Sequence, residues 1–160
     1  MAALFRSQAP APVVPARSDD DEILASLDKL QAAAKGKVPD MVTARVDRVA
    51  FVVRETVPRL TNLGPGSITA HDVLRTATSY MPEAVAAYMR LPRSFADHRP
   101  VSNGKTSLTV LCDQLDLLGS KMDDVFEAVC RADADALIAH GRFLAEKFGS
   151  GALALDPKLR

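Results

Sequence analysis

The sequence predicts an all-α protein: an antiparallel bundle of about four helices with coiled-coil character and a long C-terminal helix. Two observations favour this fold class. Alanine, leucine and valine dominate the 160 residues, tryptophan is absent and aromatic residues make up 5%, which is typical of helices rather than sheets. Apolar residues also recur at spacings of three and four, as on one face of a helix, and we find no convincing strand pattern.

The chain is expected to comprise a bundle domain over 18–149 with a tail at each end. Residues 1–17 are rich in alanine and proline and predict a disordered or extended N-terminal tail, and residues 150–160 predict a short C-terminal tail. Ser18 and the acidic run after it are a favourable N-cap and first turn. They predict a first helix over 19–34, which Gly36 ends.

A second helix is expected to begin near Pro39, whose missing N–H costs nothing in a first turn. Its apolar positions are Val42, Val46, Val49, Val53, Val57, Leu60 and Leu63. Pro58 lies inside this run and should kink the last turn or end the helix near Thr56. The following stretch "NLGPGS" predicts a break.

The third helical run should begin at Thr69, with Asp72 three residues later in a capping-box arrangement. Pro82 interrupts its apolar spacing, so the run is either one kinked helix, which we favour, or two short helices joined at Tyr80-Met81. The stretch "LPRSFADHRPVSNG" is expected to be a loop.

The last third of the chain carries the strongest periodicity. Spacings of three and four run through Leu108, Leu111, Leu115, Leu118, Met122, Val125 and Val129. After a slip of one residue they resume as Cys130, Ala134, Leu137, Gly141, Leu144 and Phe148. A helix of about 40 residues would be about 60 Å long, so it either bends near "RADAD" or projects and meets a partner. The stripe over 108–125 is therefore a candidate association seam.

Charge and cysteine usage exclude several classes of protein. The 20 basic and 20 acidic side chains balance, which argues against a generic nucleic-acid binder. No apolar run approaches the roughly 18 residues that span a bilayer, and no basic start leads into a hydrophobic stretch as in a secretory signal. Cys112 and Cys130, about 27 Å apart if they share one helix, predict free thiols in a reducing cytoplasm.

Gly104-Lys105-Thr106-Ser107 is similar to the end of a phosphate-binding loop. The glycine that starts such a loop would have to stand at position 99, which is an arginine, and no apolar strand precedes it. The same letters fit a helix start better, with Ser102 or Asn103 as N-cap.

The sequence predicts no catalytic, cofactor or metal site. Acidic residues mark one side of the last helix, namely Asp113, Asp116, Asp123, Asp124 and Glu127. They lie off the leucine stripe and lack the Glu-x-x-His pairs of bundle metal sites, which indicates a solvated face. His71, His98 and His140 stand in no ligand motif.

One basic segment is a candidate contact for an anion, a lipid head group or an acidic partner. It contains Arg90, Arg93, His98, Arg99 and Lys105 against a single acid, Asp97, and leads into a helix start. An ordinary solvated loop is the alternative interpretation.

The stretch "TATSYMPEAVAAYMRLP" over 76–92, with the leucine-patterned helix and "LIAHGRFLAEKF" after it, resembles the XpaC-like family over about residues 70–148. The Tyr80-Met81-Pro82 step is similar to a Tyr-Leu-Pro of that family. The family is associated with bromochloroindolyl phosphate hydrolysis and toxic-anion (tellurite) resistance. The resemblance implies amphipathic helices and a role in stress, and it assigns no catalytic residue here.

Taken together, these patterns predict a non-enzymatic cytoplasmic protein that acts by helix-mediated association with itself or another protein, in toxic-anion or envelope stress. The alternatives are a phosphate-ester hydrolase, or a peripheral membrane or anion-binding protein, using the basic segment over 90–105.

Overall fold

The computed structural model describes residues 18–152, with side chains through residue 149, and confirms the all-α fold class. The predicted N-terminal tail and residues 153–160 of the predicted C-terminal tail lie outside the described residues. The elements follow in the order α1 (Asp19–Ala34), α2 (Asp40–Thr56), η1 (Val57–Leu63), α3 (Ile68–Arg75), η2 (Thr76–Tyr80), α4 (Met81–Met89), α5 (Arg93–Ala96), β1 (Pro100–Ser102), β2 (Lys105–Thr106) and α6 (Ser107–Ala152).

The first two helices have the ends that the sequence predicts. The hydroxyl of Ser18 accepts a hydrogen bond from the Asp21 amide at 3.3 Å and caps α1, and Gly36 turns the chain with a φ of 72°. Pro39 is the N-cap of α2, so its missing N–H leaves no bond unmade. The α-helix ends at Thr56, and the chain continues through Pro58 as the 3₁₀ turns of η1.

The third helical run begins one residue earlier than predicted and has a different cap. Helix α3 starts at Ile68, and the Ser67 hydroxyl accepts from the Ala70 amide at 3.3 Å, so the predicted capping box of Thr69 and Asp72 is wrong. Serine at the N-cap serves the same first-turn donors. The run continues unbroken into α4 through the π-helical turn η2, which stands directly before Pro82. A widened turn accommodates the proline without ending the helix.

The expected loop before the long helix holds regular structure instead. It contains the short helix α5 and a two-stranded antiparallel hairpin, in which Pro100 pairs with Thr106 and Ser102 with Lys105. Asn103 and Gly104 form the turn with φ values of 48° and 74°, the left-handed pair that a tight hairpin needs. The predicted helix start at Ser102 or Asn103 is therefore wrong, and α6 begins at Ser107.

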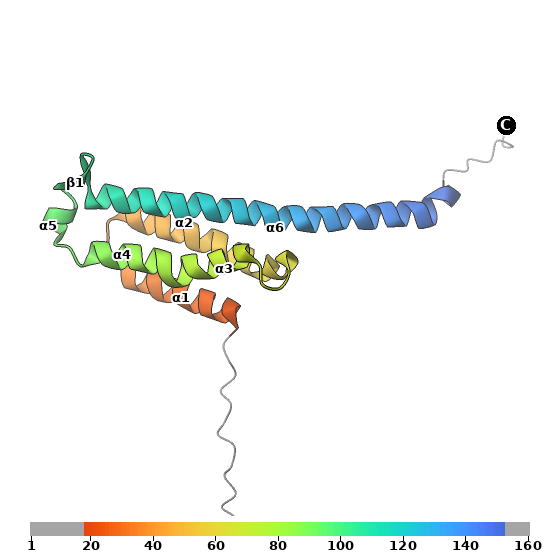
Figure 1. Ribbon diagram of the computed structural model, residues 1–160, viewed down its shortest axis with the longest axis horizontal. Coiled ribbons are helices and arrows are strands. Elements are labelled where there is room, and N and C mark those ends of the chain that lie inside the picture. The colour runs from red at the N-terminus through yellow and green to blue at the C-terminus, as the bar shows by residue number, and fades with distance from the viewer. Residues whose placement is uncertain (1–17, 153–160) are drawn as a thin grey trace, which may run out of the picture.

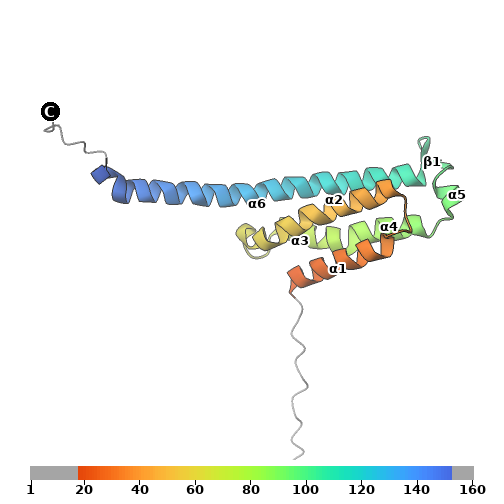
Figure 2. The same cartoon turned by 180° about the vertical axis from the view of Figure 1, so that it is seen from behind.

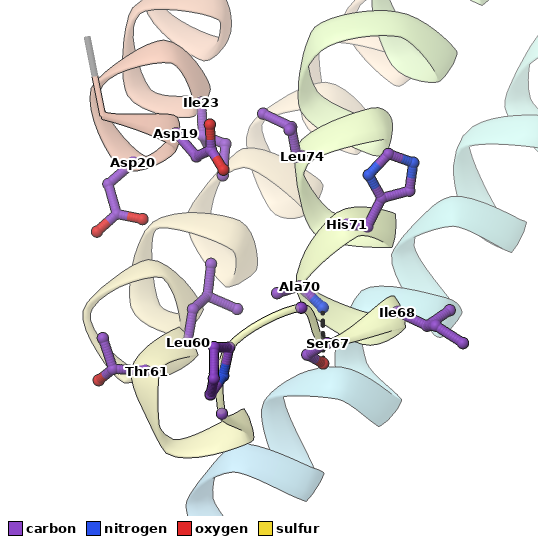
Figure 3. A pocket seen from close by; sticks show the side chains of 13 residues that line it. Asp19, Asp20, Ile23, Leu60, Thr61, Ser67, Ile68, Ala70, His71 and Leu74 are labelled. Atoms are coloured by element: carbon purple, nitrogen blue, oxygen red, sulfur yellow. Dashed lines mark hydrogen bonds between the residues drawn. The ribbon is translucent and has the colours of Figure 1, made fainter. Parts of the chain in front are cut away.

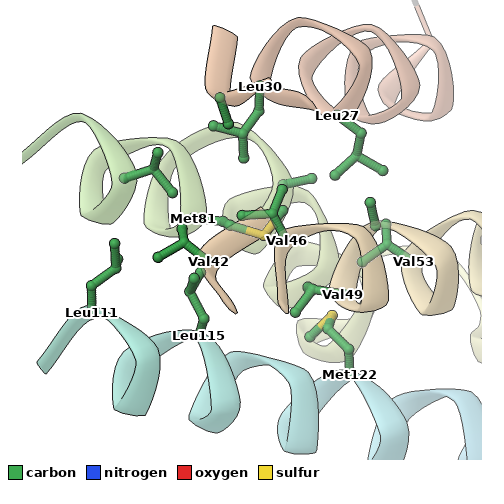
Figure 4. Packing of buried hydrophobic residues seen from close by; sticks show 14 of the residues in the cluster. Leu27, Leu30, Val42, Val46, Val49, Val53, Met81, Leu111, Leu115 and Met122 are labelled. Carbon is green, nitrogen blue, oxygen red and sulfur yellow. The ribbon is translucent and has the colours of Figure 1, made fainter. Parts of the chain in front are cut away.

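The core lies where α1, α2, α4 and the first half of α6 meet. Valines of α2 occupy its centre, between Leu27 and Leu30 of α1 on one side and Leu115 and Met122 of α6 on the other (Figure 4). These side chains are buried, and their removal from water is the main term that stabilises the bundle.

Helix α6 is unbroken over 46 residues, about 69 Å, and does not end at "RADAD". Its first half lies along α2 and α4, and its second half projects past the bundle into solvent (Figures 1 and 2). Of the two predicted alternatives, a bend or a projection, the structure has the projection.

Candidate functional site

Most side chains of the predicted association seam, residues 108–125, are buried inside the bundle. Leu111, Leu115, Met122 and Val125 are buried, and Leu108 and Leu118 are half-buried against the same core. Their contacts are with α2, α4 and η1. The expectation that this stretch offers a surface to a partner is therefore wrong, because α2 and α4 already cover it. The periodicity itself was the correct signal of a packed helix face.

The acidic side of α6 faces arginines of α2 rather than solvent alone. Arg45 Nε lies 3.0 Å from Asp116 Oδ1. Further along the two helices, Arg48 pairs with Asp123. Gly119 makes room for this second pair, since a Cβ at that position would meet the Arg48 guanidinium. The interpretation of these aspartates as a merely solvated face is thus incomplete. They join α6 to α2, although half-exposed ion pairs contribute little energy each.

Two of the cations of the basic segment over 90–105 are paired with carboxylates in the structure. Arg93 Nε lies 3.3 Å from Asp97 Oδ2, and Lys105 Nζ lies 2.5 Å from Asp113 Oδ2 on α6. Arg90 and Arg99 are exposed, as is His98, whose Nδ1 lies 3.3 Å from the Ser94 carbonyl oxygen. The segment brings these five side chains to one end of the bundle, but two of its cations already have carboxylate partners.

The stretch that is similar to a phosphate-binding loop forms the hairpin turn and strand β2. Gly104 occupies the turn and Lys105 belongs to β2, so its ammonium group points to Asp113 and not into a backbone cradle. The Thr106 hydroxyl accepts from the Thr109 amide at 3.2 Å and caps the start of α6. These contacts give the stretch a structural role.

Two buried groups at this end of the bundle have shifted pKa values. Burial raises the pKa of the Tyr88 hydroxyl to about 12, and the hydrogen bond that it donates to Asp97 Oδ1 at 2.5 Å adds to the shift. Burial also raises the pKa of the Cys112 thiol, which disfavours the reactive thiolate. Both side chains belong to the apolar core of the bundle.

An open hollow of about 860 Å³ lies between the start of α1, η1 and the start of α3. Figure 3 shows Asp19 and Asp20 on one side of it and His71 and Ile68 on the other, with Leu60 and Leu74 between. The Ser67 hydroxyl in its wall is occupied by the cap of α3. Within the described residues no group of three metal-ligating side chains forms, here or elsewhere.

The projecting half of α6 exposes several large apolar side chains. Its exposed stripe continues the seam after the slip: Ala134, Leu137, Gly141, Leu144 and Phe148, with Ile138 beside it. Leu137 is 72% exposed and Phe148 65%, whereas Leu115 on the same helix is fully buried. A monomeric protein rarely leaves such side chains in a continuous row.

The stripe is uncovered because α6 projects past the end of the bundle, and every residue from 133 to 148 is exposed on all sides of the helix. The one-residue slip at 129–130 also turns the stripe around the helix axis. One residue corresponds to about 100° around a helix, so the exposed stripe faces sideways from the direction of the bundle. The bundle ends near Asp133, which accepts a hydrogen bond from Asn62 Nδ2 at 2.6 Å and lies 3.8 Å from Arg59 Nε. Beyond that residue the stripe meets none of the bundle's own helices.

None of the described helices combines the length and the apolar character that crossing a membrane requires. Comparison with protein-family models, with curated proteins and with solved structures finds no match to this chain.

Sequence reasoning missed two features of the structure, the hairpin before α6 and the exposed part of the α6 stripe. It did not find the hairpin, although Asn103-Gly104 is a strong hairpin signal when extended residues flank it. It placed the seam over 108–125 rather than 130–148, although the slip that separates the two stretches was visible. Only the position of α2 and α4 decides which stretch is covered.

Proposed function

We propose that the chain is a non-enzymatic helical-bundle protein that acts by association with a partner helix through the projecting half of α6. The observation that carries this proposal is the exposed apolar stripe of Leu137, Leu144 and Phe148 on a helix that continues well past its own bundle. Fully burying one leucine is favourable by about 1.5–3 kcal/mol, so covering this stripe supplies a substantial driving force for binding.

The structure favours association over the alternatives at the basic segment. A phosphate-ester hydrolase or an anion-binding surface needs converging donors that are free to meet the phosphate. Arg93 and Lys105 are held by Asp97 and Asp113, so two of the cations of the segment already have carboxylate partners. On the projecting helix the described residues from 134 to 148 are all exposed.

We also propose a setting for this association, which rests on the XpaC-like resemblance alone. It is a cytoplasmic role in toxic-anion (tellurite) or envelope stress. A strain lacking the gene should be more sensitive to tellurite than its parent, and the wild-type gene should restore resistance where a variant with a disrupted stripe does not. Equal sensitivity of parent and deletion strain would remove this setting.

The association itself is tested by capture from the native cell with three baits. Wild-type protein is compared with Leu137→Asp/Leu144→Asp, which places charge in the stripe, and with Ala139→Asp, which places charge on the far side of the same helix. We expect wild type and Ala139→Asp to retain a common partner, which includes the chain itself, and the double variant to lose it. A set of captured proteins that is the same for all three baits would contradict the proposal.

A further inference from the structure

We infer that the partner of the projecting helix is a second copy of this chain, packed antiparallel, with the two-fold axis crossing the rod at the level of residue 139, whose own side chain points away from the interface. This inference rests on the proposed function and names the partner for the same surface. It commits to one register, in which Leu137 of each copy packs against Gly141 of the other. The resulting dimer has the two bundles at opposite ends of a shared two-helix rod.

The sizes of the stripe residues select the antiparallel direction. In a two-helix rod, antiparallel helices pair the first and fourth positions of the heptad, whereas parallel helices pair each residue with its own copy. The antiparallel register pairs Cys130 with Phe148, Ala134 with Leu144, and Gly141 with Leu137, each twice. Every layer then holds one small and one large side chain, which interdigitate without a void.

Other arrangements lose this match. Parallel pairing sets Gly141 against Gly141 and Phe148 against Phe148, which leaves a gap in one layer and crowds another. Shifting the antiparallel register by one heptad sets Leu137 against Phe148, or Leu144 against the charge of Glu127. The chosen register is thus the one that uses the whole stripe from 130 to 148.

Charges beside the stripe agree with the same register. It places Asp133 of each copy opposite Lys147 of the other, one such pair at each end of the rod. Asp133 also accepts from Asn62 within its own chain, whereas Lys147 Nζ lies 5.5 Å above the ring of Phe143, which stands outside the stripe, so Lys147 turns from that ring to reach the partner. On the other flank Ile138 meets its own copy at the axis.

The slip leaves space for a second helix. The stripe over 130–148 is turned by about 100° from the face that α2 and α4 cover, so a helix lying on it runs beside the bundle and not into it. The helix continues past the last bundle contact at Asp133 for about four turns of exposed residues, from 134 to 148, which gives the second copy its own length of contact.

The first test is the mass of the full-length protein in solution as a function of concentration. Sedimentation equilibrium from about 1 µM to about 1 mM should show the mass rising from 17.2 kDa to twice that value. Leu137→Asp/Leu144→Asp should weaken the dimer by about a hundredfold or more, because each buried leucine contributes at least tenfold. Ala139→Asp, on the far face, should dimerise as the wild type does.

The direction of the helices is tested by a spin label on Ser120→Cys in a Cys130→Ala background, with Cys112 buried and unlabelled. The antiparallel register separates the two labels by about 57 Å along the rod. Parallel helices 8–10 Å apart would bring them within about 30 Å. In the same background, a short bismaleimide should link Ile138→Cys to its own copy and leave Ala139→Cys unlinked.

The register is tested by charge reversal. Lys147→Glu should weaken the dimer about threefold to tenfold, since it places two carboxylates opposite each other at both ends of the rod. Adding Asp133→Lys to that variant should restore dimerisation. Restoration is a result that general damage to the helix would not produce.

The outcomes separate this inference from the proposed function. A dimer with the long label distance supports both. A dimer with the short distance, or with equal linking at 138 and 139, overturns the antiparallel register. A chain that stays monomeric to about 1 mM overturns self-association, and the proposed function then stands only if a different protein is captured through the stripe. A monomer whose captured proteins ignore the stripe overturns both.

Discussion

At the scale of single residues, two polar contacts of Asp97 join the end of α4 to α5. The Tyr88 hydroxyl donates to Asp97, and Asp97 in turn holds Arg93, so one carboxylate joins the end of α4 to the turn of α5. The hydroxyl is buried while Asp97 is only partly so. A hydrogen bond to a charged acceptor in such a place contributes more than a neutral one.

We expect Tyr88→Phe to lower the free energy of unfolding at neutral pH by about 1.5–3 kcal/mol, because the variant loses a hydrogen bond to a charged group. The pKa of Tyr88 is about 12 in the folded chain and about 10 when unfolded. The neutral hydroxyl is therefore favoured by folding, and its contribution is complete below pH 10 and is lost as the pH rises through 12. Urea unfolding of both proteins from pH 8 to 12 should show their difference shrinking. A constant difference would contradict this role.

The two cysteines should differ in reactivity although they lie on one helix. Cys112 is 6% exposed and burial raises the pKa of its thiol, whereas Cys130 is half-buried where the bundle ends. At pH 7.5, and at a protein concentration low enough to keep the chain monomeric, we expect a thiol reagent to label Cys130 rapidly and Cys112 only on unfolding. Mass spectrometry of digested, labelled protein measures both rates. Equal labelling in the native state would show that Cys112 is not shielded.

At the scale of elements, α6 has two halves that use the same kind of stripe differently. The half over 107–129 packs against α2 and α4, and the half beyond Asp133 packs against nothing in its own bundle. In the sequence both halves carry apolar residues at spacings of three and four, with a slip of one residue between them. The difference arises from which neighbours the preceding helices supply, and not from the composition of the stripe.

Replacing a leucine by alanine should therefore lower the free energy of unfolding strongly in the first half of α6 and hardly at all in the second. Leu115→Ala removes a fully buried side chain and should lower the free energy of unfolding by about 2–5 kcal/mol. Leu137→Ala removes an exposed one and should change it by less than about 0.5 kcal/mol in dilute monomer, because alanine also favours the helix. Denaturant titration at low protein concentration measures both. Similar costs would mean that the projecting half is covered within the monomer.

At the scale of the whole molecule, the bundle is complete without the projecting helix. The core side chains come from Ile23 to Val129, and Asp133 makes the last polar contact that we find with another element of the described chain. The second half of α6 thus adds a surface and not a layer of core. The projecting half, which we call the arm (residues 134–149), extends the direction of the first half of α6, because the helix is continuous through the end of the bundle.

A chain that ends after Asp133 should fold as a stable monomer. Because it keeps the core and the contacts with Asn62 and Arg59, its thermal midpoint should lie within about 3 °C of that of the dilute full-length protein. Circular dichroism measures both midpoints, and sedimentation tests whether concentration dependence disappears with the arm. A midpoint lower by about 10 °C or more would show that the arm supports the bundle.

The sequence by itself determined the elements whose signals are local. Ser18 and Gly36 bound α1, Pro58 ends α2, and the spacing of leucines produces α6, because caps, prolines and periodicity act through neighbouring turns. The Asn103-Gly104 hairpin was also within reach of such signals. Helix α5 and strands β1 and β2 were harder to predict, because each is at most four residues long and too short to show a periodic pattern.

Only the tertiary structure decided which part of the long stripe is available. Residues 108–129 and 130–148 carry the same pattern, and the sequence alone favoured the first as a surface for partners. The packing of α2 and α4 covers the first part, and most of the second part lies beyond the end of the bundle, where every residue from 133 to 148 is exposed. Burial is set by the neighbours that the fold brings near, and a pattern along one helix does not contain that information.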